Sequence, residues 1–286
     1  MSREKKRFGD RRDARKVKVK NGESNILIDF KPQRCDSIVY MNSKIDVTNF
    51  VKYIDKLKKG GMSVTYFHGI MMVLAKTLYS RPKMNYFVQN RTLYEHDDVS
   101  LGFVAKEEFE DEAVELLTVL KVKETDTLED ISTFLKKRVE QIRSKSSDQS
   151  IDGAADTLGK LPLFLRVPVV GLLKWLDKHG WLPSSLVEGN MYYCSAMVSN
   201  LGTFKVGAIL HNLTNFGTCS SLITFGEIRK EADGKSYMEM GATIDERIAD
   251  GFYFCKALKL IEYMFANPKI LMEPAGEKVH IPEKKK

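Results

Sequence analysis

Cysteine is scarce in this sequence and never occurs in pairs. The four cysteines stand singly at Cys35, Cys194, Cys219 and Cys255, with no Cys-x-x-Cys pair and no cysteine–histidine spacing. Zinc centres and disulfide frameworks need clustered thiols. We therefore expect no metal site and no disulfide framework, and we expect a reducing compartment, the cytoplasm, as the location.

Long uncharged hydrophobic runs are also missing. No charge-free stretch reaches the length of about 18 apolar residues that a membrane-spanning helix needs. The N-terminal residues are charged and no apolar core follows them, unlike a secretory signal. At 286 residues, 43% of them hydrophobic, the chain is long enough for a large core. We expect a soluble globular protein without a transmembrane segment.

The formal net charge of +7 is concentrated at the two ends of the chain. Residues Arg3 to Lys20 are mostly lysine and arginine, and the chain ends in three lysines. Nucleic-acid surfaces interleave basic residues with aromatic ones, and only Phe8 interrupts the N-terminal run. We expect no nucleic-acid partner. A solvated basic arm over residues 1–22 is the favoured interpretation, and attraction of an anionic ligand is the alternative.

The spacing of apolar residues predicts a mixture of helices and strands. Helices are predicted over residues 46–57, 64–79, 127–142 and 252–266. Strands are predicted over residues 24–30, 37–41, 114–122, 191–198, 219–228 and 236–245, with two more between residues 91 and 105. The helix over residues 64–79 is apolar nearly all round, so we expect it to be buried.

The segment from Leu161 to Leu186 is unusually apolar and contains both tryptophans. Pro162, Pro168 and Gly171 interrupt it, so one spanning helix is not expected. We predict two short amphipathic helices, which form an apolar helical insertion over residues 161–187. Packing within the domain or an oligomer interface is the favoured role, and contact with a membrane surface or a partner is the alternative.

One motif near the C-terminus points to a chemistry: residues Ile244 to Gly251 read IDERIADG. The run resembles the HHxxxDG or DHRxxDG signature of the acyltransferases related to chloramphenicol acetyltransferase. That superfamily includes the catalytic domain of the acyltransferase component of 2-oxo acid dehydrogenase complexes. Glu246 stands where the family has its catalytic histidine.

Other segments match the same family in the same order along the chain. They are NSKIDVT from Asn42 to Thr48, the helix exit from Arg81 to Asn85, VSNLG from Val198 to Gly202, residues Asn215 to Gly226, and Asn267-Pro268 after the last helix. The resemblance implies an α/β (two-layer α+β) domain of the chloramphenicol acetyltransferase-like fold, in which helices cover one mixed sheet. It places the catalytic domain over residues 23–270, with a charged tail over residues 271–286.

The resemblance also implies an assembly and a substrate. Family members are usually trimers with the site between subunits, so we expect a homotrimer. Members from dehydrogenase complexes carry lipoyl domains ahead of the catalytic domain, and this chain has no room for them. Coenzyme A, as acyl-CoA, is therefore the implied substrate, without a covalent lipoyl group. An acidic run from Lys106 to Glu112 replaces the family's Gly-Leu-x-x-Pro segment, which borders the substrate channel.

Site roles carry over from the family residue by residue. A family histidine takes the proton from the attacking hydroxyl or thiol, a serine or threonine donates to the oxyanion, and an Asp–Arg pair holds the loop. Here Glu246 is the altered base and Ser199 matches the oxyanion donor. Asp250 and Arg11 match the structural pair, with Arg12 and Arg15 as nearby alternatives for the arginine.

Three histidines are candidates to substitute for the missing base. His211 follows the SNLG turn, in a segment that approaches a neighbouring subunit's site in the family, and it is the best candidate. His68 falls in the apolar helix, where a core role is expected, and His96 falls in a loop near the channel strand.

Three functions remain open at this point, and the third is a membrane-surface or partner-docking module that uses Leu161 to Leu186. The first is transfer of an acyl group from coenzyme A to a hydroxyl, thiol or amine, with Glu246 as the base. A glutamate has a reference pKa of about 4.3, so this role requires a water-poor pocket that raises it. The second is a catalytically inactive trimeric scaffold or binding protein that kept the fold. The enzyme also needs a channel that reaches Glu246 and Ser199, whereas the scaffold does not.

Overall fold

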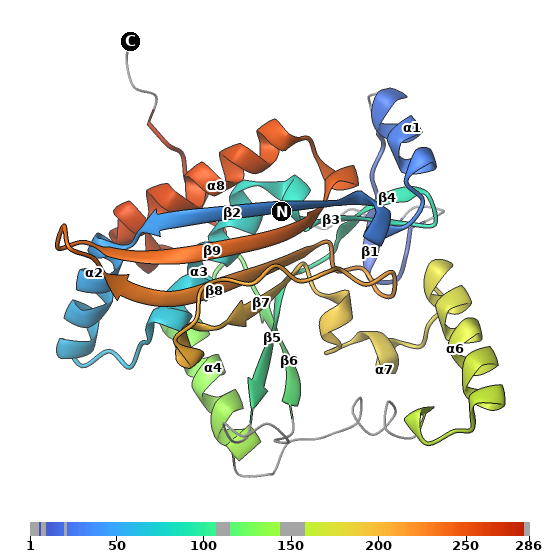
Figure 1. Cartoon of the computed structure of the whole chain (residues 1–286), viewed down its shortest axis with the longest axis horizontal. Coiled ribbons are helices and arrows are strands. Elements are labelled where there is room, and N and C mark those ends of the chain that lie inside the picture. Colours follow the sequence, from blue (N-terminus) through green and yellow to red (C-terminus); the bar gives the residue numbers. More distant parts are fainter. Residues whose placement is uncertain (1–5, 7–9, 20–21, 107–114, 144–157, 283–286) are drawn as a thin grey trace.

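A six-stranded mixed sheet forms the centre of the molecule in this computed structural model, which describes residue 6 and residues 10–19, 22–106, 115–143 and 158–282 (Figure 1). In spatial order its strands are β2 (Ile38–Asp46), β9 (Ser236–Asp245), β8 (Ser221–Lys230), β7 (Ala196–Asn200), β5 (Val99–Lys106) and β6 (Glu115–Val122). β7 runs parallel to both neighbours, and the other pairs are antiparallel. The expected mixed sheet is confirmed.

Helices cover one face of this sheet (Figure 1). They are α2 (Thr48–Lys59), α3 (Tyr66–Ser80) and α8 (Gly251–Ala266), with α4 (Leu128–Arg143) packed beside α3. Alternate residues of β9, from Met238 to Ile244, join the core with buried residues of α3 and α8, because successive side chains of a strand point to opposite faces. Every residue of α3 from His68 to Leu78 is buried, as the sequence predicted.

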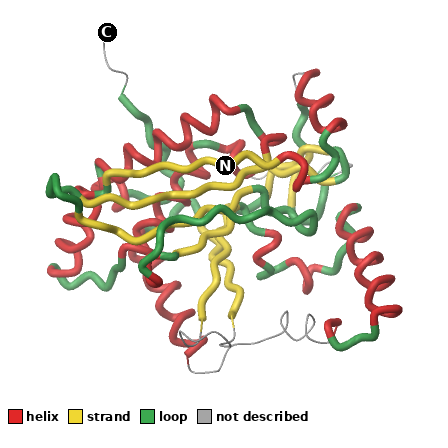
Figure 2. Tube along the Cα trace, in the orientation of Figure 1, coloured by secondary structure: helices red, strands yellow, loops and turns green. Residues whose placement is uncertain are grey.

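An extended segment, residues 205–217, crosses the opposite face of the sheet. The Val206 carbonyl accepts a hydrogen bond from the Glu227 N–H on β8 at 2.9 Å, and the Ile209 carbonyl accepts one from the Thr224 hydroxyl at 2.6 Å. Figure 2 shows this segment as a long green loop beside the yellow strands. We call residues 205–217 the crossing segment.

A smaller antiparallel sheet stands at one end of the molecule, in the order β1 (Ala14–Lys16), β4 (Thr92–His96) and β3 (Tyr86–Gln89). Ala14 is fully buried there. Part of the segment that was expected to be a solvated arm is therefore packed. At the other end of the chain, Leu271 and Ala275 of the expected tail are also fully buried.

The predicted elements agree with most of the observed ones, but the strand predicted over residues 37–41 continues to Asp46, and three other regions differ. Residues 24–30 were predicted to form a strand but belong to helix α1 (Gly22–Phe30). The strand predicted from residue 191 starts only at Ala196, after a 3-10 turn over Met191–Tyr193. Strands β1 and β3 were not predicted.

The apolar insertion folds as two helices, as expected, but the first is longer and less packed than predicted. α6 (Leu163–Lys178) runs through Pro168 and Gly171 and lies at the edge of the molecule, away from the large sheet (Figure 1). Asp177 is the one residue of α6 that is buried, and a short helix, α7 (Ser184–Val187), follows. Within the described ranges, no helix combines the length and apolar character needed to span a membrane.

Candidate functional site

Glu246 lies in the turn between β9 and α8. β9 ends at Asp245, and a 3-10 turn over Glu246–Ile248 leads to the start of α8 at Gly251. The carboxylate of Glu246 is bonded to the ammonium of Lys31, and its side chain is 29% exposed. Glu246 therefore stands half-buried in an ion pair and not in a water-poor pocket.

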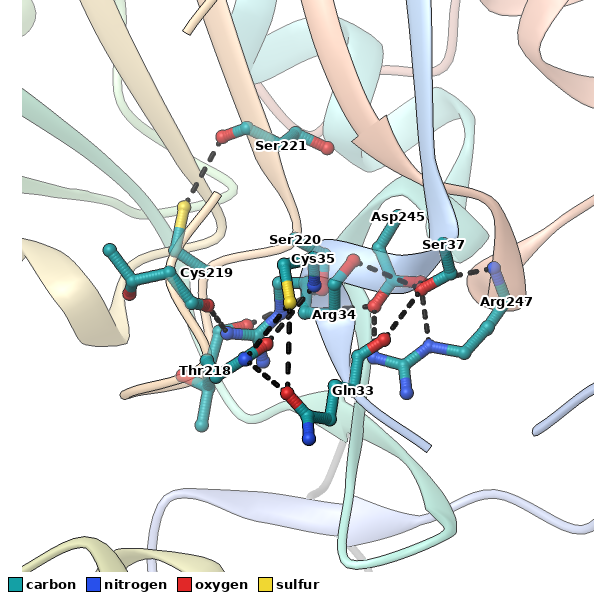
Figure 3. A network of polar contacts seen from close by, with 12 residues as sticks. Gln33, Arg34, Cys35, Ser37, Thr218, Cys219, Ser220, Ser221, Asp245 and Arg247 are labelled. Carbon is teal, nitrogen blue, oxygen red and sulfur yellow. Dashed lines mark hydrogen bonds and ion pairs between the residues drawn. The ribbon is translucent and has the colours of Figure 1, made fainter. Parts of the chain in front are cut away.

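Asp245, the residue before it, is the centre of a buried polar network (Figure 3). Its Oδ1 accepts hydrogen bonds from the Arg247 backbone N–H at 3.1 Å, from Arg247 Nε at 2.8 Å and from Ser37 Oγ at 3.1 Å. Its Oδ2 accepts from Arg247 Nη2 at 2.6 Å, and Arg34 Nε lies 3.7 Å away. Two guanidinium groups thus share one carboxylate, and all three side chains are at most 2% exposed.

The two arginines of this network also hold neighbouring segments in place. Arg247 Nη1 donates to the Lys31 carbonyl at 2.9 Å. Arg34 donates from Nη1 to the Thr214 carbonyl at 2.7 Å and from Nη2 to the Gly217 carbonyl at 3.0 Å. Burial lowers the pKa of Arg34 from its usual value. The network therefore fixes the backbone at Lys31, whose side chain binds Glu246, and the end of the crossing segment at Gly217.

The expected pairing of Asp250 with Arg11 is wrong. Asp250 is exposed and caps α8, where its carboxylate accepts a hydrogen bond from the Tyr253 N–H at 2.8 Å. Arg11 is buried and donates to the Asp13 carboxylate at 2.9 Å and to the Asp177 carbonyl at 2.9 Å. Each group has a nearer partner, because an open helix N-terminus attracts a carboxylate and a buried guanidinium needs acceptors around it.

The alternative arginines do not replace Arg11 in that pairing. Arg15 Nε lies 3.4 Å from the Asp97 carboxylate, and Arg12 is exposed. Within the described residues, neither Arg12 nor Arg15 forms an ion pair with Asp250.

Ser199 lies on β7, far from Glu246 in the same chain. The strand register places Ser199 opposite Thr224 on β8, and Thr224 opposite Gly241 on β9. Glu246 follows Gly241 by five residues, about 17 Å along the strand, and lies two strand spacings across, about 10 Å. The two residues are therefore about 19 Å apart within one chain. A site that uses both must take Ser199 from another subunit.

The histidines do not restore a base beside Glu246 in this chain. His211 is exposed on the crossing segment. His68 is a buried core residue, as expected, and its Nδ1 accepts a hydrogen bond from the Thr65 N–H at 3.3 Å. Burial lowers the pKa of His68 to about 4.

His96 was expected in a loop, but it ends β4 and is buried. Its Nδ1 lies 3.0 Å from the Asn85 carbonyl and its Nε2 lies 2.9 Å from the Thr218 hydroxyl. Burial lowers the pKa of this imidazole to about 4. His96 also lines a polar cavity of about 270 Å³, together with Arg11 and Tyr193. Neither Glu246 nor Ser199 lines that cavity.

Asp177 is a second polar centre, which the sequence analysis missed. Its Oδ1 accepts a hydrogen bond from the Tyr193 hydroxyl at 2.8 Å, and its Oδ2 accepts from Gln89 Nε2 at 2.9 Å and from the Gly217 N–H at 3.0 Å. Asp177 is 1% exposed, and it fastens the end of α6 to the domain. The one acidic residue of a helix whose other charged residues are all basic was the signal available in the sequence.

The acidic run that replaces the family's channel segment falls almost wholly on residues 107–112, outside the described ranges.

No family model matches this sequence. No curated protein matches it either.

Solved structures, in contrast, share its fold. A probable dihydrolipoamide acetyltransferase from Listeria monocytogenes is 16% identical, with a TM-score of 0.57 over 88% of this chain and 94% of that chain. The cubic core of a pyruvate dehydrogenase multienzyme complex is 13% identical, with a TM-score of 0.57 over 90% and 94%. A chloramphenicol acetyltransferase is 10% identical, with a TM-score of 0.57 over 88% and 99%. The chain has the chloramphenicol acetyltransferase-like fold, and these structural neighbours are acyltransferases.

Proposed function

We propose that this chain transfers an acyl group from coenzyme A to an acceptor, with Glu246 as the general base. The observation that supports this role is the buried network around Asp245, which fixes the turn that carries Glu246. Burying two guanidinium groups around one carboxylate carries a desolvation cost, and such networks can fix a conformation. A fixed position for residue 246 is what a base needs, because proton transfer requires hydrogen-bond distance. The neighbouring subunit would complete the water-poor pocket that the role requires, since Glu246 is 29% exposed in the single chain.

An amine is the acceptor that suits a glutamate base best. Amines are protonated in neutral water, and a carboxylate binds an ammonium, as Glu246 binds that of Lys31. The ammonium would lose one proton to water, and the amine nitrogen would attack the thioester carbonyl while Glu246 accepts the second proton, which becomes acidic as the carbon–nitrogen bond forms. The carbon–sulfur bond then breaks, and the coenzyme A thiolate takes this proton from Glu246 and leaves as the thiol.

The oxyanion of this step would be stabilised by Ser199 of a neighbouring subunit in a homotrimer. A hydroxyl aimed at the developing negative charge lowers the barrier. Exposed apolar side chains beside Ser199 support an interface there: Phe204 is 51% exposed, Ile209 50% and Leu210 41%. The same interface would bring His211, on the crossing segment, toward the neighbouring site.

The test measures coenzyme A released from a panel of acyl-CoA donors, separated from the acceptor by chromatography, in the presence of amine, hydroxyl and thiol acceptors. Glu246→Gln keeps the shape but cannot accept a proton, so the rate should fall by roughly 10²–10⁴-fold. Glu231→Gln is a matched control, because it breaks a Lys–Glu pair on the surface, with Lys44, and should leave the rate unchanged. Equal rates in wild type and Glu246→Gln would reject Glu246 as the base.

The ion pair between Glu246 and Lys31 favours a second candidate, an inactive trimeric scaffold. A carboxylate held by an ammonium must first leave it before it can act as a base. Glu246→His restores the residue of the family motif. Turnover by Glu246→His but not by wild type would identify a retired enzyme. If neither variant turns over or binds coenzyme A, the acyltransferase proposal fails and the scaffold remains.

A further inference from the structure

The outer surface of α6 is the largest run of exposed apolar side chains along the described chain. Leu163 is 64% exposed, Phe164 73%, Val167 60% and Leu172 56%. A helix that is apolar nearly all round normally lies in a core or in lipid. α6 instead stands at the edge of the molecule, and its outer side faces away from both sheets (Figure 1). We call the exposed side chains of residues 163–181 the α6 surface.

An aromatic cluster closes the C-terminal end of the α6 surface. The Trp175 and Trp181 rings are 5.3 Å apart, and the His179 ring lies 4.6 Å and 5.1 Å from them. His179 Nδ1 is 2.8 Å from the Trp175 carbonyl, which fixes the imidazole between the two indoles. Trp175 is nevertheless 49% exposed and Trp181 58%. Two large rings are thus held in place with half of their surface in water.

The charges around this surface have one sign. Lys160, Lys174 and Lys178 are exposed, and Arg166 is half-buried. The sequence from residue 160 to 181 contains one acidic residue, Asp177, and its carboxylate is buried and bonded within the domain. The outer side of α6 therefore presents apolar, aromatic and cationic groups without a compensating carboxylate of its own.

The attachment of α6 leaves this surface free to meet a partner. Asp177 fastens one side of the helix end, and Leu182, 4% exposed, packs directly after the aromatic cluster. The domain thus holds α6 by its inner side and presents the outer side. At 16 residues, α6 is about 24 Å long, too short to cross a bilayer.

We propose that the α6 surface docks on an anionic lipid membrane, with α6 lying in the plane of the interface. Apolar residues of such a helix enter the boundary between headgroups and acyl chains, while lysines contact anionic headgroups. Tryptophan prefers this depth, because its ring is apolar and its N–H needs a polar partner. The charge favours lipid over a second copy of the chain, since each copy carries a net charge of +7 and the same lysines.

The chain offers a direct test, because Trp175 and Trp181 are its only tryptophans. Tryptophan fluorescence therefore reports on the α6 surface alone. Purified protein comprising residues 1–286 is mixed with vesicles of phosphatidylcholine, or of phosphatidylcholine with phosphatidylglycerol. We expect co-sedimentation and a blue-shifted emission with the anionic vesicles, and much weaker binding to the neutral ones.

Variants separate the parts of the surface. Replacing Phe164 and Leu172 together by serine should lower the partition coefficient at least roughly tenfold, because less apolar surface enters the boundary. Replacing Lys174 and Lys178 together by glutamate should lower it roughly tenfold or more with anionic vesicles. Phe30→Ser is the matched control: Phe30 is 80% exposed on α1, away from α6, and its loss should not change binding.

Three results would overturn the proposal. The first is no binding to either vesicle. The second is binding that both double variants retain, which would assign it to basic residues elsewhere. The third is a blue shift that grows with protein concentration without lipid, which would identify a second copy of the chain as the occupant.

Discussion

His96 is buried in surroundings that favour its neutral form. The Asn85 carbonyl can only accept a hydrogen bond, so Nδ1 must carry the proton, and Nε2 then accepts from the Thr218 hydroxyl. Burial is the main cause that lowers the pKa of His96 to about 4; Arg11 lowers it further and Asp13 opposes this. A proton added to Nε2 of His96 would require the Thr218 hydroxyl to turn and accept the hydrogen bond instead of donating it.

This imidazole should make the fold sensitive to acid. In the unfolded chain a histidine has a pKa of about 6.5, so it gains its proton as pH falls below that value, whereas folded His96 gains it only near pH 4. Stability should therefore be full above pH 6.5 and fall between pH 6.5 and 4. His96 should contribute a loss of about 2 kcal/mol between pH 7 and pH 5.

Urea unfolding at pH 7 and pH 5 tests this prediction. His96→Asn keeps an N–H that can donate to Asn85 but does not titrate, so the difference between the two pH values should shrink by about 2 kcal/mol. His68 stays in both proteins and adds its own loss. His280→Asn, at an exposed position near the C-terminus, should leave the difference unchanged. The same difference in wild type and His96→Asn would contradict the prediction.

The residues of the candidate site show what one sequence can and cannot predict. The motif located Glu246, because the motif is one continuous segment. The partners of Asp245 could not be found this way: Ser37 is 208 residues from it along the chain, and the contact exists only after folding. The Arg11–Asp250 pair failed for the same reason. The sequence resemblance could not show that the insertion would bring Asp177 to Arg11.

At the scale of elements, the strongest patterns were the reliable ones. β9 and α8 were predicted to within one residue of their observed bounds, because long periodic segments with clear ends leave few alternatives. Residues 24–30 have the β-branched composition of a strand, but a strand needs a partner edge. β2 already occupies the free edge of β9, and the segment forms α1 instead, in which Ile28 is buried.

Pro168 misled the prediction for α6. Proline inside a helix removes one backbone hydrogen bond and bends the helix, but it does not have to end it. Pro168 lies early in α6, at an exposed position, where water can bond the freed carbonyl. The helix therefore continues to Lys178.

The attachment of α6 should depend on Asp177. Asp177→Ala leaves the Arg11 guanidinium short of a neighbouring carboxylate and leaves Tyr193, Gln89 and the Gly217 N–H without an acceptor. Breaking a buried charged network in this way should lower the free energy of unfolding by roughly 3–5 kcal/mol. Hydrogen exchange should also accelerate in α6 before the rest of the domain.

The control for this change is an exposed ion pair. Asp29 bonds Arg91 at 2.9 Å with both side chains more than half exposed, so Asp29→Ala should cost at most about 1 kcal/mol. Protection of α6 that is unaffected by Asp177→Ala would show that other contacts hold the helix.

Two exposed apolar regions dominate the surface of the described part of the molecule, and we propose a different function for each. The α6 surface carries lysines and tryptophans. The other region, residues 204–210, adjoins Ser199 and contains Phe204, Val206, Ile209 and Leu210. Neither region is covered by described parts of the chain. Leaving apolar area in contact with water costs about 25 cal/mol for every Å².

The second region should be the subunit interface of a homotrimer. Light scattering should give three times the 32.6 kDa of one chain, and Ile209→Asp should give a monomer, because it places a charge in an apolar contact. Phe134→Ser, on α4 and 38% exposed, serves as the control and should stay trimeric. Vesicle binding through the α6 surface should survive in the monomer.

A mixing experiment then decides whether the trimer builds the site. In a closed ring, each interface would join Glu246 of one subunit to Ser199 of the next. Glu246→Gln and Ser199→Ala subunits should each be inactive alone. When the two are unfolded together and refolded as mixed trimers, some interfaces pair an intact Glu246 with an intact Ser199, so part of the wild-type rate should return. A trimer whose mixture stays inactive would show that these two residues do not meet across the interface, and a stable monomer at micromolar concentration would remove the interface itself. With the two residues about 19 Å apart in one chain, either result would leave Glu246 without the oxyanion donor that the proposed reaction requires.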